Sequence, residues 1–178
     1  MSAPIVCDMF VFSEELDILD IRLNELNSVV DYFCIVESAY TQSRIPKPFN
    51  FEANRDRYKK FEDKIIYVKM TEFVGGNSWE AEHAQRRYLL KCLNILIEKG
   101  VNLSEDSYFI LSDVDEIPRK EAVEKVIAQN KDLMVLNHFF GSYFLNWHSN
   151  FRQPWGWYGS VIGKMGILER IDIQWLRT

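Results

Sequence analysis

The sequence predicts an α/β protein, a three-layer sandwich in which a mostly parallel sheet lies between helices. Short runs that are apolar at nearly every position are typical of strands buried on both faces. These runs alternate with stretches whose apolar residues recur at helical spacing. The chain has 178 residues, of which 47% are hydrophobic. That length suits one domain with a sizeable core, which we expect to span residues 1–178.

The first third of the chain predicts a β-α-β unit. Residues 5–12 and 32–36 are expected to be buried strands. Leucines on one helix face lie between them: Leu16, Leu19, Leu23 and Leu26. Ser13 is the expected cap of that helix. A strand, a helix and a second strand in this order imply a parallel pair with a right-handed crossover.

The middle of the chain continues the alternation. Residues 40–49 contain two prolines and are expected to form a loop, after which aromatic residues mark one face of a second helix: Phe51, Tyr58 and Phe61. Residues 64–68 are the third expected strand. A long helix is expected over residues 79–98, with Ser78 as its cap. Residues 108–111 are the fourth expected strand.

The last part of the chain changes in character. Pro118 is expected in the first turn of a helix, and residues 133–136 are the fifth expected strand. Residues 138–178 break the rhythm, with many aromatic residues and short strand-like pieces such as 158–162. We expect a core of about residues 1–137 and a small aromatic-rich C-terminal appendage over about residues 138–178.

Composition excludes several classes of protein. The net charge of −5 argues against a general nucleic-acid binder. Three widely spaced cysteines are expected to be buried and reduced: Cys7, Cys34 and Cys92. No signal peptide is visible, and the longest apolar stretch, residues 133–147, is too short and too polar to span a bilayer. A cytoplasmic protein without a membrane span is the expectation.

An acidic cluster directly after the fourth strand is the sharpest chemical feature. Strand alternation places Asp113 and Asp115 on the same side. Two converging carboxylates repel each other unless a cation is present. Their oxygens suit the hard ions Mg²⁺ and Mn²⁺, which in turn can bridge phosphates. The alternative is an acidic loop at the entry to the next helix, with Glu116 near the helix N-terminus.

Residues 113–119 (DVDEIPR) and further segments in the same order resemble one enzyme family. The matching segments are residues 14–26, residues 29–48, the spaced residues Trp79, Glu82, Gln85 and Arg86, residues 110–119 and, more loosely, residues 143–147. Together they resemble glycosyltransferase family 17, which includes the bisecting N-acetylglucosaminyltransferases. The resemblance implies a GT-A-like fold and a sugar transfer, with inversion, from a nucleotide-sugar such as UDP-N-acetylglucosamine to a glycan acceptor.

The resemblance also implies roles for residues on the donor side. Asp113 and Asp115 would hold Mn²⁺ or Mg²⁺, which neutralises the leaving diphosphate, and Asp113 would also reach the ribose. The other donor-side candidates are Phe10, Glu37, Lys47, Gln85 and Arg86. Two of them have ordinary alternatives. Glu37 could be a solvated strand end, and Arg86 could pair with the glutamate four residues before it.

The acceptor side and the general base are assigned to the aromatic tail and to nearby carboxylates. Tryptophan faces suit sugar rings, and the candidates are Trp147, Trp155 and Trp157. The alternative is a small aromatic core. The candidate bases are Glu116, Glu169 and Asp172. Arg119 is expected to partner the acidic cluster.

Two other functions stay open at this point. The chain could be a catalytically silent module of a larger protein that binds a nucleotide-sugar or a glycan. It could also be a phosphotransferase or nucleotidyltransferase with an Asp-x-Asp motif, although it has no glycine-rich phosphate loop. The sequence does not determine the oligomeric state.

Overall fold

A six-stranded sheet organises the computed structural model, which describes residues 3–138 and 157–177. The strand order is β3-β2-β1-β4-β6-β5. The strands are β1 (Val6–Phe12), β2 (Tyr32–Ser38), β3 (Ile65–Met70), β4 (Tyr108–Leu111), β5 (Leu133–His138) and β6 (Trp157–Lys164). The first four are parallel, and β6 runs antiparallel to both of its neighbours. The predicted mostly parallel α/β sheet is confirmed.

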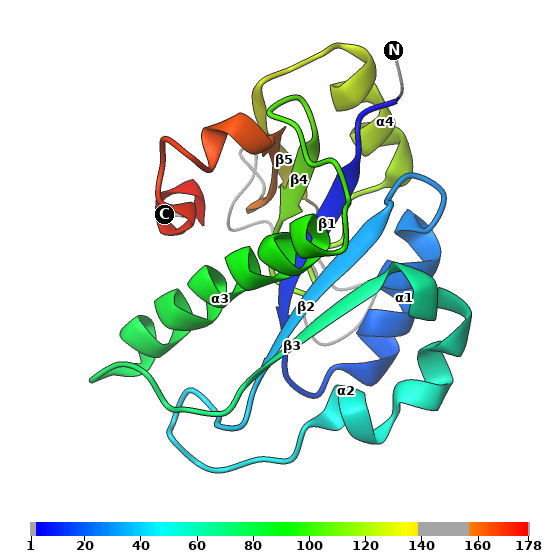
Figure 1. The fold of residues 1–178 in the computed structure, drawn as a ribbon. Coiled ribbons are helices and arrows are strands. Elements are labelled where there is room, and N and C mark those ends of the chain that lie inside the picture. The colour runs from blue at the N-terminus through cyan, green and yellow to red at the C-terminus, as the bar shows by residue number, and fades with distance from the viewer. Residues whose placement is uncertain (1–2, 139–156, 178) are drawn as a thin grey trace.

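Helices cover both faces of the sheet (Figure 1). The α-helices are α1 (Leu16–Leu26), α2 (Asn50–Ala53), α3 (Ser78–Glu98) and α4 (Lys120–Ala128), and the 3₁₀ helices are η1 (Arg55–Lys64), η3 (Met165–Ile167) and η4 (Ile173–Arg177). One apolar cluster joins the sheet to α1, α2, η1 and α4. A second joins its other face to α3 and η4. These two clusters make the three layers.

The strands β1, β2 and β4 are buried on both faces because their side chains are mostly apolar on both, whereas the edge strand β5 is largely exposed. In β1, Cys7 and Met9 belong to the cluster under α3, whereas Phe10 and Phe12 belong to the cluster under α1. All three cysteines are buried and free, as expected. Hydrogen bonds with the thiols of Cys7 and Cys92, together with burial, raise the pKa of Cys34, so this thiol stays protonated.

Helix starts differ from the expected ones. The cap of α1 is Glu15, whose carboxylate accepts from the backbone amides of the two residues before it. The cap of α3 is Asn77, whose side chain accepts from Glu80 N (3.0 Å). Pro118 precedes α4, which starts at Lys120. Only at α3 does a side chain take the capping role expected of a serine, because the Glu15 carboxylate bonds to amides that precede α1 and not to those of its first turn.

The second expected helix is divided. Its first turn, α2, ends at Ala53, and the chain then continues as the 3₁₀ helix η1. The aromatic residues that marked its face are all buried in the cluster under α1: Phe51, Tyr58 and Phe61. The apolar pattern therefore identified the buried face correctly, but it could not distinguish a regular α-helix from a broken one.

The C-terminal part of the chain enters the sheet itself. β6 contains the expected strand at residues 158–162, but it lies between β4 and β5 and not beside the sheet. Gly163 makes this possible, because a Cβ there would lie 2.7 Å from Leu133 Cδ1 and 2.8 Å from Phe109 Cζ. The expected appendage therefore includes an interior strand of the core. No helix in the described ranges has the length and apolar content needed to cross a membrane.

Candidate functional site

A cleft of about 480 Å³ opens at the carboxyl ends of the parallel strands. This is where open α/β sheets bind ligands. Its lining comes from the segments after β1, β2 and β4 and from the first half of α3. The lining residues are Val11, Phe12, Ser13, Glu14, Glu15, Ser38, Tyr40, Thr41, Gln42, Ser43, Lys47, Glu82, Gln85, Arg86, Asp113, Val114 and Asp115.

The acidic pair stands at the β4 side of this cleft. The side chain of Asp113 is 50% exposed, and Asp115 is exposed as well. Loss of hydration, together with the negative charges of Asp113, Glu116 and Glu15, raises the pKa of Asp115. Among the described residues no group of three or more His, Cys, Asp or Glu side chains forms a metal cluster. The pair thus offers two carboxylates.

Cationic side chains occupy the same cleft. Arg86 projects from α3, pairs with Glu82, and has Nη2 3.6 Å from Asp113 Oδ1. Lys47 comes from the loop after β2 and is nearly buried. Gln85, next to Arg86, also lines the cleft. Arg86 therefore forms the ion pair within α3 and also lines the cleft. The pair with Glu82 does not exclude contact between Arg86 and a ligand in the cleft.

Glu37 proves to be a structural anchor. It is fully buried at the end of β2, and its Oε1 accepts from Lys47 Nζ (2.8 Å) and Asn50 N (2.6 Å). Its Oε2 accepts from Phe51 N (3.1 Å) and Tyr67 Oη (2.8 Å). Burial and the hydrogen bond to Glu37 raise the pKa of Tyr67, which keeps the hydroxyl protonated. Both oxygens are engaged, so Glu37 is not the free acceptor expected for a donor base or ribose.

Phe10 does not line the cleft. It is fully buried, and its ring centroid lies 4.4 Å from the guanidinium carbon of Arg22. Val11 and Phe12 line the cleft instead. The sequence pattern placed Phe10 in the correct strand but could not identify which residues at its end are uncovered.

Glu116 closes the acidic loop onto β6. Its Oε2 accepts from Asp113 N (3.0 Å), and its Oε1 accepts from Trp157 Nε1. Its backbone oxygen accepts from Ser160 Oγ (2.9 Å). A carboxylate held by two donors is poorly placed to take a proton, so the structure favours a bracing role over that of general base. Trp157 is thereby tied to the loop, whereas Trp147 and Trp155 lie outside the described residues.

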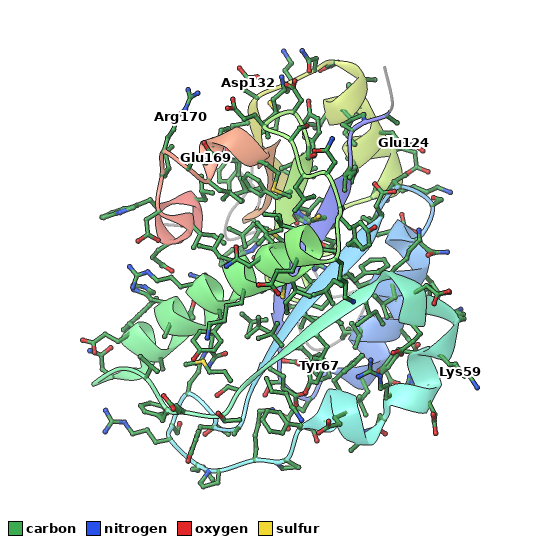
Figure 2. All side chains as sticks on the ribbon, viewed as in Figure 1. Lys59, Tyr67, Glu124, Asp132, Glu169 and Arg170 are labelled. Carbon is green, nitrogen blue, oxygen red and sulfur yellow. The ribbon has the colours of Figure 1, made fainter. Side chains whose placement is uncertain are left out.

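The other two candidate bases lie elsewhere. Glu169 and Asp172 line a separate cavity of about 350 Å³ and are absent from the lining of the cleft. Figure 2 shows Glu169 far from Tyr67, the partner of Glu37 at the cleft end of β2. Arg87 Nη2 lies 2.9 Å from Asp172 Oδ2. Arg87 and the amide of Gln174 lower the pKa of Asp172, which makes it a weaker base.

Asp172→Asn therefore gives an early test. Loss of a true general base costs about 100-fold or more in rate, whereas we expect this substitution to leave unchanged the sugar transfer that the family resemblance implies. The lowered pKa means that ionised Asp172 stabilises the fold above the usual aspartate pKa, and this contribution disappears as pH falls through the lowered value. Because the ion pair is exposed and screened, the loss in unfolding free energy should be below about 1 kcal/mol. Transfer assays and urea titrations at pH 7 and pH 3 measure both.

Another cavity, of about 360 Å³ and called the second cavity below, shares Asp115 with the cleft. Its lining combines apolar and polar side chains: Asp115, Ile117, Pro118, Arg119, Ala122, Leu136, Asn137 and His138. Asp115 is the one residue of the described ranges that lines both this cavity and the cleft. Arg119 is exposed on the wall of this second cavity, and not paired with the acidic cluster as expected.

Sequence reasoning missed two features of the site. Polar residues at the end of β2 and in the loop after it form one wall of the cleft: Ser38, Tyr40, Thr41, Gln42 and Ser43. The signal for them was a polar, proline-bearing loop at a strand end. It also missed Asp8 and Arg22, a fully buried ion pair under the acidic loop. In the sequence this pair was indicated by one charged residue inside an apolar strand, Asp8, and by one on the apolar face of a helix, Arg22.

Comparison with known proteins identifies animal enzymes that are similar to this chain in sequence. The human and rat enzymes named beta-1,4-mannosyl-glycoprotein 4-beta-N-acetylglucosaminyltransferase are each 32% identical to it over 120 residues. That alignment covers 62% of this chain, and the chain spans about a fifth of the length of these relatives, with 21% covered.

A solved structure supports the fold independently. The mannosyltransferase PcManGT from Pyrobaculum calidifontis, in complex with GDP-Man and Mn²⁺, has a TM-score of 0.56 to this chain at 13% identity. The match covers 97% of this chain and 48% of that one. At this identity the likeness concerns the fold, which is GT-A-like as expected. Residues 2–154 match the sequence model of glycosyltransferase family 17. The chain therefore belongs to glycosyltransferase family 17.

Proposed function

We propose that this domain binds a UDP-sugar and a divalent cation in the cleft and transfers the sugar to a glycan acceptor. The observation that carries the proposal is the pair Asp113 and Asp115 on a 480 Å³ cleft at the carboxyl ends of the strands, with Arg86 beside them. N-acetylglucosamine is the proposed sugar, because the animal relatives are named for its transfer.

The residues present fit a bound Mn²⁺ or Mg²⁺. Two carboxylates are a common protein contribution to such ions, and phosphate oxygens and water complete the coordination. Loss of hydration, together with the neighbouring negative charges, raises the pKa of Asp115, and a cation would neutralise those charges. The structural relative from Pyrobaculum calidifontis, which is in complex with GDP-Man and Mn²⁺, supports the binding of a nucleotide-sugar together with a divalent cation.

The chain's own residues would act on the leaving group. When the bond between the anomeric carbon and the diphosphate breaks, negative charge grows on the diphosphate. Arg86 can contact it with a planar pair of N–H donors, whereas the ammonium of Lys47, which also lines the cleft, is already engaged by Glu37 Oε1 (2.8 Å) and Ser13 O (3.2 Å). The metal, when bound, supplies further neutralisation as a Lewis acid. The hydroxyls and amides of the loop after β2 would bind the nucleoside.

The acceptor would enter through the second cavity. Asp115 stands between this cavity and the cleft, so the two substrates would meet at the acidic loop from different sides. Approach from the side opposite the diphosphate would give inversion at the anomeric carbon. The apolar residues Ile117 and Leu136 suit the face of a sugar ring, and Arg119 and Asn137 suit its hydroxyls.

Arg119→Ala separates the two substrates. We expect the KM for the acceptor to rise by about tenfold, because one hydrogen bond to a charged group is lost. Hydrolysis of the UDP-sugar without acceptor should stay unchanged, since Arg119 does not line the cleft. If Arg119→Ala weakened transfer and hydrolysis equally, the acceptor would not bind in the second cavity.

The direct test is UDP-N-acetylglucosamine turnover with and without Mn²⁺. We expect UDP binding and slow hydrolysis that require the ion and disappear with a chelator. Tight, Mn²⁺-dependent UDP binding without hydrolysis or transfer would point instead to a silent binding module. No UDP binding at millimolar ligand would overturn the proposal.

A further inference from the structure

A fully buried arginine lies beneath the acidic loop. Arg22 projects from the apolar face of α1 and meets Asp8 in the middle of β1, and both side chains are 0% exposed. Arg22 Nε donates to Asp8 Oδ2 (2.8 Å), and Nη2 donates to Asp8 Oδ1 (2.6 Å). This is the two-pronged geometry in which a guanidinium best matches a carboxylate. The ring of Phe10 packs against the guanidinium and fixes its plane.

The rest of the guanidinium is directed at the segment after β4. Arg22 Nη1 donates to three backbone oxygens: Asp113 O (2.8 Å), Val114 O (3.2 Å) and Glu116 O (3.3 Å). Arg22 Nη2 donates to Ser112 Oγ (2.6 Å). One side chain therefore bonds to four of the five residues from 112 to 116.

These contacts set the direction in which the loop presents its groups. Its backbone oxygens turn inward to Arg22, while the carboxylates of Asp113 and Asp115 line the cleft. From the other side, the carboxylate of Glu116 accepts from Asp113 N. The loop is thus held by the guanidinium of Arg22 on its buried side and by the carboxylate of its own residue Glu116.

We propose that Arg22 is a positioning residue, which Asp8 orients and which holds the acidic loop in the shape that binds the cation. The inference rests on the proposed function of the cleft. A buried ion pair is a weak source of stability, because desolvation offsets much of the attraction, and apolar residues can replace such a pair without loss of fold. They could not supply donors to three buried carbonyl groups. It is the support of the loop that specifically requires an arginine at position 22.

Arg22→Lys is the sharpest test, because lysine keeps the charge beside Asp8 and loses the planar fork. We expect a folded protein whose Mn²⁺-dependent UDP affinity falls by about tenfold or more, the usual cost of removing a residue that supports metal ligands. Hydrogen exchange of the amides at residues 113–116 should quicken, while that of β1 stays slow. Arg57→Lys is the matched control, because the ion pairs of Arg57 with α1 lie at the surface.

Calorimetry with Mn²⁺ and UDP, thermal unfolding and hydrogen exchange together decide the matter. Unchanged affinity and unchanged loop exchange in folded Arg22→Lys would overturn the positioning role alone. Wild-type protein that binds neither Mn²⁺ nor UDP would overturn the proposed function itself. If Arg22→Lys does not fold, Ser112→Ala removes a single contact of the same guanidinium. We then expect weaker cation-dependent binding from Ser112→Ala in a protein that still folds, and full affinity there would equally reject the role.

Discussion

Asp115→Asn should lower the rate of sugar transfer by about 100-fold or more, because a metal contact is worth several kcal/mol and each 1.36 kcal/mol is tenfold. The amide keeps the shape of the side chain and removes its charge. Asp115 is also the residue at which the cleft and the second cavity meet. Transfer from UDP-N-acetylglucosamine over a Mn²⁺ titration measures the effect. Higher Mn²⁺ should restore only part of the rate.

The same substitution should stabilise the metal-free protein. The pKa of Asp115 is raised, so the folded state favours its protonated form, and this contribution is lost as pH rises through the raised pKa. At neutral pH the ionised side chain therefore opposes folding, and an uncharged one does not. A small rise in melting temperature, removed by lowering the pH, is the expected signature. Asp172→Asn is the matched control, and an equal loss of transfer there would contradict the assignment.

Glu37→Ala should cost about 3 kcal/mol or more in the free energy of unfolding, since it leaves buried charged and polar donors without their acceptor. The donors that lose it are Lys47 Nζ, Tyr67 Oη and the amides that begin α2. The loop that carries Lys47 also forms one wall of the cleft, so UDP affinity should fall as well. Urea titration and UDP calorimetry measure the two effects.

Glu52→Gln is the control for this second substitution. It removes another glutamate that pairs with a lysine, Lys69, but the pair is exposed. Its loss should cost less than about 1 kcal/mol. If Glu37→Ala remained as stable as Glu52→Gln, the anchor role of Glu37 would be wrong.

The sequence predicted the features that depend on local pattern. Strands buried on both faces have no polar face, so their apolar runs were visible without knowledge of their neighbours. The carboxylates of Asp113 and Asp115 follow such a run directly, and the carboxyl end of a parallel strand is where ligands bind. Their presence on the cleft therefore needed no long-range information.

Residues with roles set by distant partners could not be assigned in this way. A glutamate at a strand end suits ligand binding and internal bracing equally, and only the donors gathered around Glu37 from α2, β3 and the loop after β2 decide between them. Arg22 and Asp8 are fourteen positions apart in sequence and meet only when α1 packs on β1. The place of β6 was equally invisible, because pairing between strands depends on topology and not on the strand's own pattern.

The insertion of β6 between β4 and β5 has a consequence for the order of folding. The parallel strands β3, β2, β1 and β4 can pair as soon as residues 6–111 are available, whereas β5 pairs only with β6 in the described sheet. Because β6 is the last strand of the sheet in chain order, it is synthesised after the others, so closure of the sheet by β6 should be a late step when the domain folds during synthesis. Trp157 and Ser160 of β6 are also the partners that secure Glu116. The acidic loop would then reach its final shape when the sheet is completed, and the domain would gain the proposed cation affinity only after β6 has paired.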